Sequence, residues 1–492
     1  MRIRIALLVV GGLATPILAR AQGWPGRARL EPEQCTAAPA GTASAWLEKA
    51  RTATGLAAVS GILHWRATDV DVQFYQSDRP YPPFLANDDA GDWWFDPATG
   101  AERWDAAGRP MAIVRNERAT YAVRDTLRRA MPPMHAFYSP SRALNPLAVL
   151  ADWREGEVRL AARCTFRGFP RIVLERAGER LYLNERSGVP VKFERIEPHP
   201  TWGQVRLEYV YGTWWRSGPV SLPVVSVQYL DGVEHLRRDV RLPQRAAELL
   251  VTVVPADSAP SLTTGPEDHR SAPGFEAQVM PVDTVRVDAS TVLLRTQAYT
   301  HAVTVQRDTV FLLDATTAEW RSRADSALIA ALFPKARATV LVVTDLAWPH
   351  IGGVRFWAAR GATIVTHDLS RPFLSQLLDR RWTLKPDLLE TMRRAGRRPP
   401  PIRAVGAGLA LAGGAVRVLP IDGVASEGAL MVAVGGAFLW AGDYIQQVSA
   451  PSQYAAEVID ATRRFGIEPE RTAAQHLPLT PWQTVRSANP GS

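Results

Sequence analysis

The chain has 492 residues, of which 46% are hydrophobic, 22% charged and 8% aromatic. This balance excludes a wholly disordered chain and a coiled-coil rod, and the length allows roughly two to four domains of ordinary size. The formal net charge is +8, but the basic residues are scattered among acidic ones. A nucleic-acid-binding surface needs a basic stripe interleaved with aromatic residues, so we expect no nucleic-acid partner.

The first 21 residues have the pattern of a secretory signal peptide. Arg2 and Arg4 precede an apolar run at 5–18, and the small residues Ala19 and Ala21 offer a cleavage site. An uncleaved N-terminal anchor is the alternative, although the apolar run is shorter than the about 18 residues of a membrane helix. We therefore expect 1–21 to be removed and the mature protein to be exported, periplasmic or secreted, without a stable membrane span.

The chain has two cysteines, Cys35 and Cys164. In an oxidising compartment they can form a disulfide bond, but Cys164 also lies in an apolar run that fits a buried free thiol. The sequence does not show whether the two are close, so both alternatives stay open. No CxxC pair is present, which excludes the common thiolate zinc sites.

Residues 22–255 are rich in short alternating runs typical of strands, and we predict a β-rich N-terminal domain built on a curved antiparallel sheet. Residues 181–183 and 191–196 read as two strands around a turn, and a helix is predicted at 43–54. The many tryptophans of this part suit the packing of such a sheet. A ligand groove lined by them is the less favoured alternative.

Residues 256–275 are rich in Pro, Ser and Gly and are predicted to be a linker. A mixed pattern of strands and helices follows in 276–492, which indicates a layered α/β architecture. Its predicted helix at 318–333 places Arg323 and Asp325 on the solvent side. The other predicted elements of this part are strands at 303–313, 339–343, 362–365, 404–420 and 429–440 and helices at 354–359 and 452–465.

One segment of this second part carries a motif. The sequence TDLAWPHIGG at 344–353 resembles the first metal motif of the metallo-β-lactamase superfamily, in which a strand runs into T-H-x-H-x-D-H-x-G-G. Asp314 resembles the acidic residue that ends the family's opening hairpin, and QHLP at 475–478 lies where the last ligand histidine is expected. The resemblance covers about 276–490 and implies an α+β fold, a four-layer αββα sandwich.

Many ligand positions of the family are substituted. Three match: His350, Asp443 and His476. The positions expected to hold the other ligands are occupied by Asp345, Ala347, Pro349 and Ala425. The resemblance thus implies an eroded, degenerate metal centre with at most one metal, zinc or iron, and leaves open that there is none. Asp345 is a candidate general base or extra ligand.

The resemblance implies an exported hydrolase-like protein that, if active, cleaves an ester, lactone, thioester or amide of an unknown small molecule. The alternative is a non-catalytic binding or scaffold protein that kept the fold and lost the metal site. His367 follows a strand and is interpreted as structural. Five further histidines show no ligand spacing and receive no role: His64, His135, His199, His235 and His269.

Overall fold

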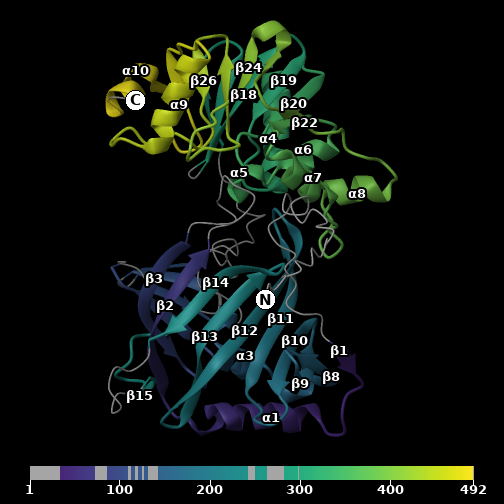
Figure 1. Ribbon diagram of the computed structural model, residues 1–492, viewed down its shortest axis with the longest axis vertical. Helices are drawn as coiled ribbons and strands as arrows, with labels where there is room; N and C mark the ends of the chain where they lie inside the picture. Colours follow the sequence, from purple (N-terminus) through teal and green to yellow (C-terminus); the bar gives the residue numbers. More distant parts are fainter. Residues whose placement is uncertain are drawn as a thin grey trace, which may run out of the picture.

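The computed structural model describes residues 34–72, 86–108, 112–116, 120–124, 127–130, 142–241, 250–262, 282–296 and 299–490. The predicted signal peptide and most of the predicted linker lie outside these residues. Figure 1 shows two lobes, which we call the N-terminal unit (described residues of 34–262) and the C-terminal unit (described residues of 282–490). In the described part of the chain, no helix is long and apolar enough to cross a membrane.

The N-terminal unit contains one large sheet in which every described strand pair is antiparallel, as the sequence predicts. Its long strands bury alternate side chains, and the core on that face includes Trp93 of β3 (Ala86–Phe95) and Trp153, which follows helix α3 (Pro146–Asp152). Helix α1 (Ala43–Thr54), confirmed at its predicted position, packs Leu47 and Ala50 into this core, together with α3 (Pro146–Asp152). The strands are β1 (Gln34–Thr36), β2 (Ile62–Val72), β3 (Ala86–Phe95), β4 (Glu102–Ala106), β5 (Ala112–Arg115), β6 (Thr120–Arg124), β7 (Leu127–Ala130), β8 (Arg159–Phe166), β9 (Phe169–Arg176), β10 (Glu179–Asn184), β11 (Pro190–His199), β12 (Gly203–Ser217), β13 (Val220–Leu230), β14 (Val233–Val240) and β15 (Thr252–Val254).

A disulfide bond closes one edge of this sheet. Strand β1 pairs with β8, and the register places Cys35 directly opposite Cys164, to which it is bonded. Of the two alternatives left open by the sequence, the structure therefore shows the disulfide. The bond joins residues separated by 129 positions, so it removes a large loop-closure entropy from the unfolded chain.

One buried histidine of the sheet makes the stability of the N-terminal unit sensitive to acid. The Nδ1 atom of His235 accepts a hydrogen bond from Nε2 of Gln228 at 3.0 Å, and a carboxylate oxygen of Asp71 lies 3.9 Å from Nε2. Burial of the imidazole lowers the pKa of His235 to about 3. The unfolded chain takes up a proton near pH 6.5 and the folded chain does not, so acid favours unfolding.

We therefore expect His235→Gln to flatten the pH dependence of stability. Between pH 7 and pH 5, the free energy of unfolding of the wild-type protein should fall by about 2 kcal/mol more than that of the variant. Urea denaturation at both pH values, followed by circular dichroism, measures this difference. Equal losses in the two proteins would contradict the prediction.

The C-terminal unit is built from two sheets. The first contains β16 (Asp283–Arg286), β17 (Thr291–Arg295), β18 (Thr300–Gln306), β19 (Thr309–Leu313), β20 (Ala338–Val342), β21 (Thr363–His367) and β22 (Arg403–Val405). The second contains β23 (Leu409–Leu411), β24 (Val416–Pro420), β25 (Leu430–Val434), β26 (Phe438–Trp440), β27 (Arg471–Ala473) and β28 (Thr480–Pro481). The helices are α4 (Glu319–Leu332), α5 (Trp348–Ile351), α6 (Val354–Ala359), α7 (Arg371–Asp379), α8 (Leu388–Arg394), α9 (Gln453–Arg464) and α10 (Trp482–Ala488).

Three hydrophobic clusters show how these elements are layered. Val342 of the first sheet and Val432 of the second lie in one shared core. On the outer side of the first sheet, α4, α6, α7 and α8 contribute to a second cluster, and α9 and α10 cover the second sheet in a third. The order is therefore helices, sheet, sheet, helices, as Figure 1 also shows.

Of the two residues predicted on the solvent side of α4, one is exposed and the other is buried. Arg323 is exposed, as predicted, but Asp325 is buried, and Nε of Arg321 donates to both of its carboxylate oxygens at 2.8 and 2.9 Å. Nε2 of His301, from β18, lies 3.5 Å from the same carboxylate. A charged residue can be buried when it is paired, and helical periodicity alone does not reveal such a partner.

Candidate metal centre

The loop after β20 delivers the first residue of the site. The chain leaves the first sheet at Val342 and forms the one-turn helix α5, which carries His350. Two glycines follow because the backbone passes very close to α4 and the segment before it. A Cβ atom on Gly352 would lie 2.0 Å from the carbonyl oxygen of Thr317, and one on Gly353 would lie 2.0 Å from Oγ of Ser322.

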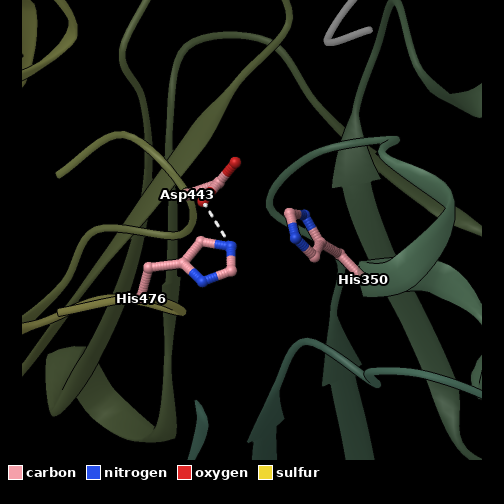
Figure 2. Close-up of side chains that lie close together, drawn as sticks. All are labelled: His350, Asp443 and His476. Carbon is pink, nitrogen blue, oxygen red and sulfur yellow. Dashed lines mark ion pairs between the residues drawn. The ribbon is translucent and has the colours of Figure 1, made fainter. Parts of the chain in front are cut away.

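The structure brings the three residues that match the family motif to one place. His350 lies on α5, Asp443 follows β26, and His476 follows β27. One ligand atom from each residue lies within 4.8 Å of the other two, and Nε2 of His476 is 3.5 Å from Oδ1 of Asp443. Figure 2 shows Asp443 and His476 next to each other, with the imidazole of His350 facing them. In the described part of the chain, this is the group whose geometry could hold a metal ion.

Asp345 lies behind His350. Its Oδ1 atom is 2.6 Å from Nδ1 of His350 and also accepts the backbone N–H of Ala347 at 2.9 Å. A carboxylate can only accept here, so the proton of the imidazole is held on Nδ1 and Nε2 is left as the ligand atom. A carboxylate on the second nitrogen of a ligand histidine is a common support of metal sites.

A second buried carboxylate, Asp314, ties the loops of the site together. It accepts hydrogen bonds from the backbone N–H of Thr344 and from the indole N–H of Trp440, both at 2.8 Å. The side-chain amide of Gln475 donates to Asp314 at 3.1 Å and to Asp345 at 3.3 Å. Because these partners come from both sheets, the hydrogen bonds fix the strand ends that carry the three candidate ligands.

The site has an excess of buried carboxylate charge. Burial alone would lower the pKa of His350, but the nearby Asp345 and Asp443 carboxylates outweigh it and raise this pKa to about 9. Burial raises the pKa of Asp314 to about 6, and the neighbouring charge of Asp345 adds to the effect. Burial likewise raises the pKa of Asp443. Carboxylates that resist ionisation in a buried site gain most from a cation.

The donor set fits a divalent metal ion. Oδ1 of Asp443 is buried and has no hydrogen-bond partner among the residues that the structure describes. Two imidazoles and one carboxylate form a ligand set used by catalytic zinc and by mononuclear iron. Ligand atoms within 4.8 Å of one another can share a point about 3 Å from each. Bonds near 2 Å then require the side chains to close by about 1 Å.

Tyr299, just before β18, also belongs to the site. Its ring centroid lies 5.3 Å from that of His476 and 5.8 Å from that of His350. The tyrosine therefore forms part of the wall around the candidate ligands. Sequence reasoning missed it because a single aromatic residue before a strand has no signal that separates it from ordinary core packing.

The substituted positions of the motif have other partners. The backbone N–H of Ala425, where the family has a histidine, donates to the carboxylate of Glu457. The carbonyl oxygen of Pro349 accepts the N–H of Thr317. His367, interpreted as structural, accepts the N–H of Leu369 at Nδ1 and lies 3.2 Å from a carboxylate oxygen of Asp422, outside the three-residue group.

No family model and no curated relative matches the chain. Several solved metallo-β-lactamases match it in structure. Those from Pontibacter korlensis and Hirschia baltica are 12% and 14% identical to it, and DIM-1 metallo-beta-lactamase is 11% identical. Each match has a TM-score of 0.33 and covers 42% of this chain and 95–96% of the other. Independently of these matches, the order helices, sheet, sheet, helices in the C-terminal unit is the arrangement that the resemblance at 344–353 implies.

Proposed function

We propose that the protein is an exported hydrolase of metallo-β-lactamase-like αββα fold, with a single metal ion held by His350, Asp443 and His476. The observation that carries this proposal is that ligand atoms of the three side chains lie within 4.8 Å of one another, although the residues come from separate segments of the chain. The substituted ligand positions of the motif include Ala347 and Ala425, which offer no ligand side chain, so one ion is proposed and not two.

When bound, zinc supplies Lewis acidity and a water acidified to near neutral pH, which suits the hydrolysis of an ester, lactone, thioester or amide. The protein's own residues prepare the site for the ion. Asp345 keeps the proton of His350 on Nδ1, and Asp443 is a partly buried carboxylate whose Oδ1 atom is shielded from solvent. The ring of Tyr299 lies beside both imidazoles.

Asp345 was expected to be a general base or an extra ligand, but its hydrogen bond to His350 supports a different role, that of orienting the imidazole. The Oδ1 atom that would act as a base or as an extra ligand is already bonded to the imidazole and to the N–H of Ala347. We therefore assign Asp345 to the orientation of His350.

Export is part of the proposal. The pattern of residues 1–21 and the Cys35–Cys164 disulfide both suit an oxidising compartment outside the cytoplasm. The substrate is then a small molecule of the periplasm or the medium.

Metal analysis of the purified full chain after equilibration with zinc tests the proposal. We expect about one zinc ion per chain in the wild-type protein and almost none in His350→Ala, because the loss of one of three ligands leaves too few for tight binding. His367→Gln is the matched control, since it removes a buried histidine of the same unit outside the group and should keep the ion.

The absence of zinc and iron from both the wild-type protein and His367→Gln would refute the metal centre. The chain would then fit the alternative function, that of a binding or scaffold protein. If the ion binds but no ester, lactone, thioester or amide is cleaved, the hydrolase part of the proposal fails while the metal centre stands.

A further inference from the structure

The N-terminal unit touches the metal-site loop through one hairpin. His199 is the last residue of β11, just before the turn to β12, and its ring stacks on Trp202 at 4.5 Å with an interplanar angle of 13°. The same ring also contacts Trp348, the first residue of α5, with ring centroids 5.7 Å apart and an interplanar angle of 78°. His199 and Trp348 are both buried, so the contact excludes solvent.

The orientation of His199 is fixed by its own turn. Its Nδ1 atom accepts the backbone N–H groups of Thr201 at 3.1 Å and Trp202 at 3.2 Å. Both bonds require an unprotonated Nδ1, and burial keeps the pKa of His199 well below its usual value. The imidazole is therefore a rigid, neutral ring presented to the C-terminal unit.

Hydrogen bonds and an ion pair from one arginine hold the hairpin against the C-terminal unit. Arg380, which follows α7, donates from Nε to the carbonyl oxygen of Trp202 and from Nη2 to that of Gln204, both at 2.6 Å. The same Nη2 lies 2.6 Å from the carboxylate of Asp231. Beside it, Gly203 has no room for a side chain, since a Cβ atom would lie 2.1 Å from the indole nitrogen of Trp382.

The helix that carries His350 cannot fix its own position. Helix α5 has four residues, far fewer than the about 12 that make an isolated helix even marginally stable. Trp348 and His350 are two residues apart, so their side chains leave the helix about 200° apart. One side of α5 therefore faces the hairpin while the other presents His350 to the site.

From this arrangement we infer that the β11–β12 hairpin is a positioning element of the metal centre, with His199 as a positioning residue that acts on His350 through Trp348. The inference rests on the proposed metal site. It makes the N-terminal unit a part of the functional site. Backbone hydrogen bonds from Ala315 and Thr317 hold α5 on one side, and the His199–Trp348 contact supports it on the other.

Two substitutions of His199 separate the ring from the hydrogen-bond acceptor. His199→Asn keeps an acceptor for the turn but removes the ring that contacts Trp348, whereas His199→Phe keeps a ring and loses the acceptor. Zinc affinity of the full chain is measured by competition with a chromophoric chelator, after circular dichroism has shown that each variant is folded. We expect His199→Asn to weaken zinc binding roughly 10-fold, the lower end of the effect of outer-shell partners, and His199→Phe to remain close to the wild-type protein.

His64→Asn is the matched control. His64 also stacks on a tryptophan of the same sheet, Trp94, at 4.0 Å and 22°, and its substitution should leave zinc affinity unchanged. If the wild-type protein binds zinc and both His199 variants bind it with the same affinity, the inference is overturned while the proposed metal centre stands. Equal weakening in both His199 variants would also overturn it, since the turn and not the ring would then carry the effect.

A second measurement does not depend on how the His199 variants fold. Because coupling is reciprocal, zinc should slow hydrogen exchange at the amides of Thr201 and Trp202 in the wild-type protein and not in His350→Ala. Unchanged exchange in a wild-type protein that binds zinc would overturn the inference. A wild-type protein without zinc affinity would overturn the proposed metal centre together with it.

Discussion

Asp345→Ala is expected to weaken zinc binding roughly 10- to 100-fold while the chain stays folded. The variant removes the acceptor that lies 2.6 Å from Nδ1 of His350. Without it, the imidazole proton can move to Nε2, and the ring can rotate away from Asp443 and His476. The remaining ligands would then have to order His350 at the expense of binding free energy.

The loss of Asp345 also has an effect that favours zinc binding, but this effect is smaller than the loss of orientation. Burial opposes a charge on His350, but Asp345 and Asp443 raise its pKa to about 9, so a metal ion at neutral pH must displace a proton. Removal of Asp345 makes this displacement easier. However, the ion takes the place of that proton at Nε2 of His350, at a similar distance from the Asp345 carboxylate, and it carries twice the charge, so the carboxylate favours the ion. The net result is a loss of metal affinity.

The same variant separates the roles considered for Asp345. As an orienting residue, it should change the dissociation constant of zinc, and Asp345→Asn, which keeps an acceptor, should restore much of the affinity. As a general base alone, it should leave zinc affinity intact and affect turnover only. Isothermal titration of the three proteins with zinc decides between them, and equal affinities would contradict the orienting role.

Much of the fold could be predicted from local patterns. The helix at 43–54 and the strands predicted within 303–313 appear where the periodicity places them, as α1, β18 and β19, because each pattern reflects burial against one nearby surface. Asp325 shows the limit of this reasoning. The helical periodicity places this side chain in solvent, yet it is buried next to β18 and paired with Arg321. The burial depends on packing between segments that are distant in the sequence.

The candidate site could be predicted in part. The resemblance at 344–353 and the downstream motifs point to His350, Asp443 and His476, and the structure brings these three together. Tyr299 and the hairpin contact at His199 could not be foreseen, since they depend on how separate elements fold against one another and carry no spacing signal. The pairing of Cys35 with Cys164 likewise depended on strand register.

Arg355→Ala is expected to lower the free energy of unfolding of the C-terminal unit by about 3–5 kcal/mol, the largest effect on stability that we predict. Arg355, on α6, is buried and forms a two-pronged ion pair with Asp387, the N-cap residue of α8, at 2.6 and 3.1 Å. Its Nη1 also donates to the carbonyl oxygens of Leu377 and Leu378 at the end of α7. Alanine would leave a buried carboxylate and these carbonyl groups without their donor.

Urea denaturation followed by circular dichroism measures this loss, and two further variants interpret it. Arg355→Lys keeps the charge but not the planar fork, so an intermediate loss is expected. Arg463→Ala removes an arginine from α9 whose ion pair with Asp460 is solvent-exposed, and it should cost less than about 1 kcal/mol. A loss for Arg355→Ala as small as that for Arg463→Ala would mean that α6, α7 and α8 are held by their apolar contacts alone.

The guanidinium of Arg355 lies 4.7 Å from the ring of Trp382, which covers Gly203 of the β11–β12 hairpin. The predicted loss should therefore also loosen the docking of the N-terminal unit, because the same side chain supports both contacts.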